Sequence, residues 1–153
     1  VLLNSIYAAQ IPNEFKYNDS QVKTGGNPYA HAVLRGAVDS YGNNIPNYHY
    51  EDIIRLYDMY VGEHLKNPAV IIDTNHSNSN KRPLEQIRIV KEVVSNMKIC
   101  DKVNALVKGF LIESYIEDGN QPPDGTEYGK SITDACLGWA KTERLIYDVA
   151  DML

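Results

Sequence analysis

The stretch Ala69-Val70-Ile71-Ile72-Asp73, together with the polar run from Thr74 to Lys81 that follows it, decides the fold class of this chain. A short apolar run that is preceded by Asn67-Pro68 and closed by polar residues predicts a buried strand of a parallel sheet. In barrels built from such strands, the side chains that carry chemistry follow the C-terminal ends of the strands. His76 therefore lies where a functional side chain is expected.

The same pattern recurs on both sides of this strand. Residues 30–36 and 107–114 are short apolar runs that deliver Arg35 and Glu113 near their ends, and residues 131–136 are a candidate for a last short strand. Residues 1–9 are typical of the end of an amphipathic helix, and residues 11–29 of a loop or short hairpin. Apolar residues at helical spacing predict three further helices, near 53–65, 84–97 and 142–153.

Parallel strands alternating with helices indicate an α/β protein, and the polar residues at the strand ends match part of a TIM (β/α)₈ barrel. A complete barrel usually needs about 250 residues. The chain has 153 residues, so we expect residues 1–153 to form one domain with about half of a barrel. The chain starts without Met and within a helical pattern, which suggests a piece of a longer protein.

Composition limits the possible functions. The formal net charge of -5 and a pI near 5.3 argue against a protein that mainly binds nucleic acid. Cys100 and Cys136 form no CxxC pair, so we expect neither a disulfide framework nor a zinc knuckle, and a reducing cytoplasmic location fits best. No apolar run approaches the roughly 20 residues of a membrane span, and we expect no membrane association.

His76, Glu113 and Asp134 are the candidate metal ligands. Each falls at or just beyond the end of a predicted strand, so in a barrel the three would meet at one rim although they are far apart in sequence. Imidazole and carboxylate ligands together suit Mn²⁺, Fe²⁺, Co²⁺ or Zn²⁺. Taken singly, a histidine in a Ser/Asn loop is often a solvated hydrogen-bonder, and an acid at a strand end is often a helix cap.

Other residues are weaker candidates. Arg35 can bind a carboxylate or phosphate with its planar fork, or it can pair with a neighbouring aspartate. His31 alternates with small apolar residues and is expected to be buried. The segment from Tyr128 to Ser131 lacks the glycine spacing of a phosphate loop, and that interpretation is rejected.

Several blocks of the chain resemble the type I 3-deoxy-D-arabino-heptulosonate 7-phosphate (DAHP) synthases. The resemblance is to their C-terminal half and runs from about Ala8 to the end of the chain. The blocks are Leu34-Arg35-Gly36 with Pro46-Asn47-Tyr48, Ile72-Asp73 through His76-Ser77-Asn78-Ser79 with Lys81, Glu113-Ser114 with Gly119-Asn120-Gln121, and Tyr128-Gly129-Lys130-Ser131-Ile132-Thr133-Asp134-Ala135-Cys136 with Gly138-Trp139.

The resemblance implies the C-terminal half of a TIM (β/α)₈ barrel, with roughly the last four strand–helix units. It implies that His76, Glu113 and Asp134 are three of four protein ligands to a divalent metal. The fourth ligand of the family is a cysteine from the first strand, and neither Cys100 nor Cys136 matches it. Arg35 and His76 would bind phosphoenolpyruvate, Asp134 would also contact the sugar hydroxyls, and His76 and Asp134 would thus be catalytic.

The implied reaction joins C3 of phosphoenolpyruvate to the aldehyde of erythrose 4-phosphate, with addition of water at C2 and loss of phosphate. Two departures bear on this comparison: Ala37 stands where the family commonly has a second glycine, and the segment from Pro12 to Gly26 is shorter than the hairpin that helps bind a feedback amino acid. The sequence therefore leaves open whether Phe, Tyr or Trp inhibits the protein.

Three functional interpretations remain open from the sequence. The first is a DAHP synthase half that is catalytic only with its N-terminal half, and the second is an inactive half-barrel that merely associates with a partner. The third is a metal-dependent hydrolase or aldolase of another barrel family. Because half a barrel leaves two open sheet edges, the isolated chain is expected to self-associate as a homo-oligomer.

Overall fold

A three-stranded parallel sheet forms the centre of the computed structural model, which describes residues 2–153. Its strands are β3 (Ala32–Leu34), β6 (Val70–Asp73) and β7 (Val107–Leu111), with β6 in the middle. Both pairings are parallel, as the apolar runs predict. The three strands therefore end at the same edge of the sheet, and the polar segments that follow them come together there.

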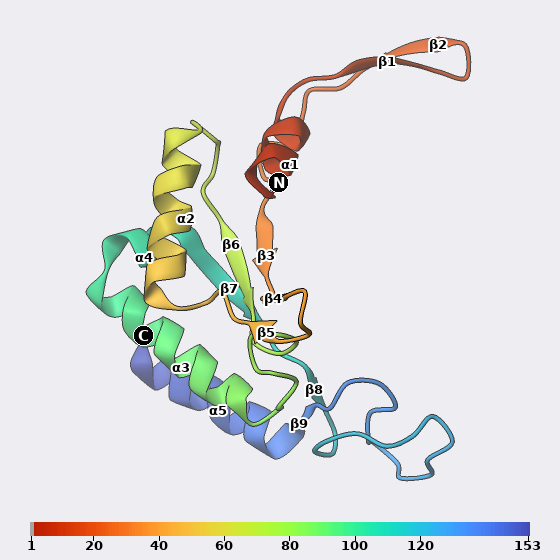
Figure 1. Ribbon diagram of the computed structural model, residues 1–153, viewed down its shortest axis with the longest axis vertical. Coiled ribbons are helices and arrows are strands. Elements are labelled where there is room, and N and C mark those ends of the chain that lie inside the picture. The colour runs from red at the N-terminus through yellow and green to blue at the C-terminus, as the bar shows by residue number, and fades with distance from the viewer. Residues whose placement is uncertain (1) are drawn as a thin grey trace.

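Helices cover one face of this sheet (Figure 1). Helix α2 (Tyr50–Gly62) connects β3 to β6, and α3 (Glu85–Ile99) and α4 (Asp101–Leu106) connect β6 to β7. The predicted helices at 53–65 and 84–97 are thus confirmed, shifted by a few residues, whereas the short α4 was not predicted. Among residues 2–153, no helix combines the length and apolar character that crossing a membrane requires.

The C-terminal part continues the alternation of strand and helix. Strand β8 (Ser114–Tyr115) pairs in parallel with β9 (Leu137–Gly138), and α5 (Trp139–Met152) follows directly. The prediction of a strand at residues 131–136 is wrong, because this segment makes only isolated bridges, at Ser131 and Cys136. The strand forms instead at Leu137, whose side chain is fully buried in the cluster beneath α3 and α5.

The N-terminal part consists of α1 (Leu2–Gln10) and a hairpin of β1 (Glu14–Tyr17) and β2 (Ser20–Lys23), which projects from the body of the molecule (Figure 1). Both elements agree with the expected helix end and short hairpin. Gln10 anchors α1, because its side chain donates to Lys66 O and accepts from Lys66 N, both at 2.8 Å. A second small hairpin, β4 (Ala37–Val38) with β5 (Asn44–Ile45), follows β3.

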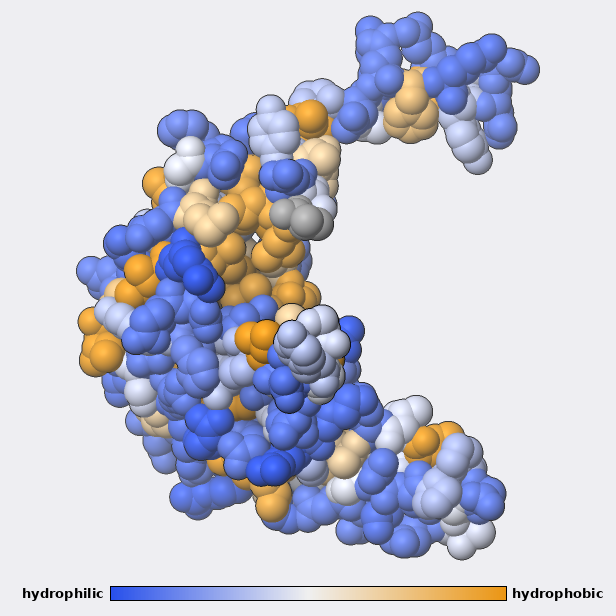
Figure 2. Space-filling view, viewed as in Figure 1, coloured by the Kyte–Doolittle hydropathy of each residue, from blue (hydrophilic) through white to orange (hydrophobic). Residues whose placement is uncertain are grey.

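The two faces of the central sheet differ. Ala32, Leu34 and Ile72 point towards the helices and are buried, while Val33 lies on the other face and is 44% exposed. Val33, Ile71 and Gly109 are aligned across the three strands. Figure 2 shows apolar residues gathered on the hollow side of the molecule. Parallel sheets are normally covered on both faces, so this open apolar face is unusual.

Candidate metal centre

His76, Glu113 and Asp134 lie close together in the structure. His76 and Glu113 follow the ends of β6 and β7 as predicted, whereas Asp134 precedes β9 and does not end a strand. Each of the three offers one ligand atom, and these atoms lie within 4.8 Å of one another. His76 Nε2 is 3.3 Å from Glu113 Oε1 and 3.6 Å from Asp134 Oδ2. The first and last of the three residues are 58 positions apart in sequence (134 − 76), and only the tertiary structure makes them neighbours.

The spacing of these atoms fits a bound cation. Metal–ligand bonds of about 2.1 Å place neighbouring ligand atoms roughly 3.0 to 3.4 Å apart. The two separations from His76 Nε2, 3.3 and 3.6 Å, are close to that range, and the separation between the two acids is within 4.8 Å. One imidazole nitrogen and two carboxylate oxygens form a donor set that Mn²⁺, Fe²⁺, Co²⁺ and Zn²⁺ all accept. The residues present therefore fit a divalent transition metal without large movements.

The orientation of His76 is fixed by Asp73, the last residue of β6. His76 Nδ1 lies 2.8 Å from Asp73 Oδ2, and the Asp73 side chain is only 4% exposed. A carboxylate only accepts, so Nδ1 carries a proton, and Nε2 is the ring nitrogen that faces the two acids and is left to coordinate a cation. His76 also has a left-handed backbone with φ of 46°, a conformation that is found at functional sites when the surroundings enforce it.

Asn75 fixes the carboxylate of Glu113. Its Nδ2 donates to Glu113 Oε2 at 2.6 Å, and its Oδ1 accepts from Ser79 Oγ at 2.8 Å. The side chain of Asn75 is fully buried, so these bonds have no competition from water. With Oε2 held in this way, Glu113 presents Oε1 to His76 Nε2.

Asp134 is the most exposed of the three candidate ligands, with a side chain that is 34% exposed. Its Oδ1 accepts a charge-assisted bond from Lys81 Nζ at 3.1 Å. The neighbouring Cys136 is buried, and burial raises the pKa of its thiol, with a further rise from the charges of Glu113 and Asp134. Cys136 thus favours its neutral form here and does not belong to the three-residue cluster.

Arg35 follows β3 at the same sheet edge, and its side chain is exposed. Within residues 2–153, no carboxylate forms an ion pair with Arg35, so pairing with a neighbouring aspartate is not observed. His31, at the other end of β3, is exposed rather than buried as predicted. The period-two pattern of β3 places Ala32 and Leu34 inside and leaves His31 outside.

Asn78 ties the ends of two strands together beneath this edge. Its Nδ2 donates to Leu34 O at 2.9 Å and to Asp73 O at 2.8 Å. Gly36 approaches the same loop so closely that an added Cβ would lie 2.7 Å from Ser77 Cβ. The loop that carries His76 is therefore held against the end of β3 by packing and by buried hydrogen bonds.

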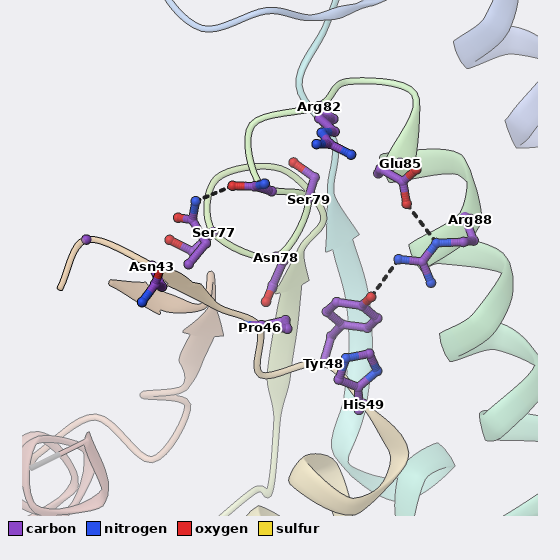
Figure 3. Close-up of a pocket in the computed structure, with 13 residues that line it drawn as sticks. Asn43, Pro46, Tyr48, His49, Ser77, Asn78, Ser79, Arg82, Glu85 and Arg88 are labelled. Atoms are coloured by element: carbon purple, nitrogen blue, oxygen red, sulfur yellow. Dashed lines mark hydrogen bonds and ion pairs between the residues drawn. The ribbon is translucent and has the colours of Figure 1, made fainter. Parts of the chain in front are cut away.

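A hollow of about 660 Å³ lies behind the His76 loop, between the β4–β5 hairpin and α3 (Figure 3). Its wall includes Ser79 and Arg88. The guanidinium of Arg88 donates to Tyr48 Oη at 2.7 Å and forms an ion pair with Glu85 at 2.8 Å. These bonds raise the pKa of Arg88. The hollow contains none of the three candidate metal ligands, so it is separate from the cluster.

Sequence patterns indicated the three candidate ligands but missed the residues that hold them. Asp73 is visible as an acid at the strand end, and Asn75 as part of the polar run that follows. Gln86 is another buried polar residue, at a position where the apolar stripe of α3 requires burial. The signal for such residues is a polar side chain in a buried position, although the sequence does not show which partner it meets.

Fold and site together define an α/β protein with a candidate metal-ligand cluster beside the C-terminal edge of a parallel sheet. Residues 4–146 match the model of the DAHP synthetase I family, and the chain belongs to this family.

The chain is 30% identical over 162 residues to the Trp-sensitive phospho-2-dehydro-3-deoxyheptonate aldolase of Escherichia coli K12, an alignment that covers 98% of this chain and 42% of that protein. It is 34% identical over 159 residues to the phospho-2-dehydro-3-deoxyheptonate aldolase of Haemophilus influenzae, covering 99% and 41%.

The fold is shared with the phospho-2-dehydro-3-deoxyheptonate aldolase of Francisella tularensis, with a TM-score of 0.81 and 25% identity. That comparison covers 98% of this chain and 43% of the other. The chain thus spans less than half the length of these relatives.

Proposed function

We propose that this chain supplies the C-terminal half of a (β/α)₈ barrel that acts as a DAHP synthase. The enzyme would condense phosphoenolpyruvate with erythrose 4-phosphate to DAHP and phosphate, the first step towards aromatic amino acids. The observation that carries the proposal is the meeting of His76, Glu113 and Asp134 at one sheet edge, in a chain that matches the family over residues 4–146.

The open face of the sheet supports the half-barrel. Val33, which is 44% exposed, lies on the same face of the sheet as its register partners Ile71 and Gly109. In a closed barrel, the face opposite the helices lines the interior. An N-terminal half from the same polypeptide or a second chain would cover this face and close the barrel. It would also bring the fourth ligand, the cysteine that the family resemblance implies. The expected self-association of the isolated chain stays a prediction.

In the proposed enzyme, His76 Nε2, Glu113 Oε1 and Asp134 Oδ2 would hold the divalent metal. When bound, the metal supplies Lewis-acid polarisation of the aldehyde oxygen. Asp73 keeps the proton of His76 on Nδ1, so that Nε2 stays available as a donor atom. Arg35, which has no carboxylate partner among the described residues, would bind the carboxylate or phosphate of phosphoenolpyruvate.

Asp134 would have a second role at the sugar. It is the most solvent-accessible of the three ligands, and the ion pair of Oδ1 with Lys81 leaves Oδ2 towards His76. An erythrose hydroxyl that approaches from solvent therefore meets this carboxylate first. We assign His76 and Asp134 to catalysis and Arg35, His76 and Asp134 to substrate binding.

The test is to combine the chain with an N-terminal half of the family and Mn²⁺, and to measure phosphate release from both substrates. Glu113→Gln keeps the shape of the side chain but removes a charged ligand, and turnover should fall at least a hundredfold. Glu117→Gln, an exposed acid four residues later, is the matched control and should retain turnover. Full activity of Glu113→Gln would refute the metal assignment, and no activity of the wild-type pair would favour an inactive half-barrel.

A further inference from the structure

Gln86 is a buried amide that none of the roles above uses. It lies in the first turn of α3, next to Glu85, and its side chain is 0% exposed. The other buried residues on this helix are all apolar. A polar side chain in such a position lowers stability unless its hydrogen bonds are satisfied.

The carboxamide of Gln86 pairs with the main chain of Glu113 on both sides. Gln86 Oε1 accepts from Glu113 N at 2.9 Å, and Gln86 Nε2 donates to Glu113 O at 3.0 Å. The hydroxyl of Thr74 lies 3.0 Å from Gln86 Oε1 and 3.0 Å from Leu111 O, so its single proton serves one of these acceptors at a time. Gln86 thus links α3 to the ends of β6 and β7.

This pairing gives the main chain of Glu113 hydrogen bonds that no neighbouring strand supplies on the β6 side. The ladder between β6 and β7 ends where Thr74 N donates to Leu111 O at 2.9 Å. Two residues later, Glu113 O accepts from Leu137 N at 3.0 Å, next to the pairing of β8 with β9. Glu113 is therefore the junction between the two pairings, and on the β6 side the amide of Gln86 takes the place of a strand residue.

We propose that Gln86 is a positioning residue that sets the metal-binding geometry of Glu113, an inference that rests on the proposed metal site. Gln86 fixes the main chain of Glu113, Asn75 fixes Oε2, and Oε1 is thereby placed 3.3 Å from His76 Nε2. Without Gln86, the junction is held on one side only. Glu113 then samples positions in which Oε1 does not face the other two ligands, and the affinity for the metal falls.

The test uses Gln86→Met, which keeps the length of the side chain and removes the carboxamide, with both its carbonyl oxygen and its NH₂ group. A matched control exists in the same chain, because Gln10 makes the same two-sided pairing with the main chain of Lys66, with both distances 2.8 Å. Gln10 anchors α1 ahead of the start of β6, whereas the ligand cluster follows the end of β6. Gln10→Met therefore imposes the same chemical change away from the candidate ligands.

The measurement is the Mn²⁺ dissociation constant of each folded variant by titration, with metal-free melting recorded in parallel. Gln86→Met should bind Mn²⁺ about tenfold or more weakly than wild type, as for other groups that orient a ligand. Gln10→Met should lower the melting temperature about as much as Gln86→Met, but its Mn²⁺ dissociation constant should stay within about twofold of wild type. If Gln86→Met does not fold, Gln86→Glu, which keeps the acceptor for Glu113 N and loses the donor, should still weaken binding.

Equal affinities of the Gln86 and Gln10 variants would overturn the inference. If wild type binds Mn²⁺ and Glu113→Gln weakens it, but the Gln86 variants do not, the positioning role alone is wrong and the metal site stands. If wild type binds no Mn²⁺, both the site and the positioning role are wrong.

Discussion

Replacing Asp73 with asparagine should separate metal binding from folding. In the wild type, Asp73 Oδ2 accepts from His76 Nδ1 at 2.8 Å, while Oδ1 accepts from Asn75 N at 3.0 Å. In Asp73→Asn, the amide oxygen can keep the bond to Asn75, which leaves the NH₂ group facing His76 Nδ1. Nδ1 must then accept, and the ring proton moves to Nε2.

The magnitude follows from where this proton goes. Nε2 lies 3.3 Å from Glu113 Oε1, so in the metal-free protein the relocated proton finds an acceptor at once. The free energy of unfolding should therefore change by about 1 kcal/mol or less, the difference between a charged and a neutral hydrogen bond. A protonated Nε2 cannot coordinate a cation, and metal affinity should fall by roughly ten- to a hundredfold, or about 1.4 to 2.8 kcal/mol.

The assay is Mn²⁺ titration near neutral pH, together with urea unfolding in the presence of a chelator. Asp58→Asn is the control, because Asp58 makes an exposed ion pair with Lys102 at 2.7 Å on α2 and α4. This control should lose no metal affinity. If Asp73→Asn binds Mn²⁺ as tightly as wild type, Asp73 does not fix the tautomer of His76, and the reasoning fails.

Two further predictions concern stability. Gly36→Ala should lower the free energy of unfolding by roughly 1 to 3 kcal/mol, because Gly36 has φ of 73° and its added Cβ would lie 2.7 Å from Ser77 Cβ and 2.9 Å from Ile45 O. Gly42 has φ of 85°, but a Cβ added there would have no atom within 4 Å. Gly42→Ala should therefore lose less free energy of unfolding in urea, and equal losses in the two variants would contradict the packing argument. The pKa of Asp148 is held below its ordinary 3.8 chiefly by the hydrogen bond from Lys91, which joins α3 to α5, against an opposing effect of burial. A lowered folded pKa gives stability that is complete above the unfolded value and is lost as pH falls through the folded one, so Asp148→Asn should flatten the fall in melting temperature below about pH 4. If the melting temperatures of wild type and variant decrease in parallel with pH across this range, Asp148 contributes nothing to the loss of stability in acid.

The sequence predicts most of the secondary structure because local patterns determine it. The apolar run at 69–73 and the apolar stripe of α3 need no distant partner to be recognised, and both elements are confirmed. The errors fall where distant contacts decide. The last strand forms at Leu137 rather than at 131–136, because burial under α5 outweighs the local preference of the earlier segment.

The sequence by itself determined the candidate ligands His76 and Glu113, since each follows an apolar run whose strand character is a local property. Asp134 was also named from the sequence, but on a strand at 131–136 that the structure does not form. Only the tertiary structure decided how these side chains are held. Asp73 faces His76, Asn75 meets Glu113 across two strand ends, and Gln86 reaches the Glu113 main chain from a helix. Such contacts depend on sheet register and helix docking, which join residues far apart in the chain and leave no periodic pattern in the sequence.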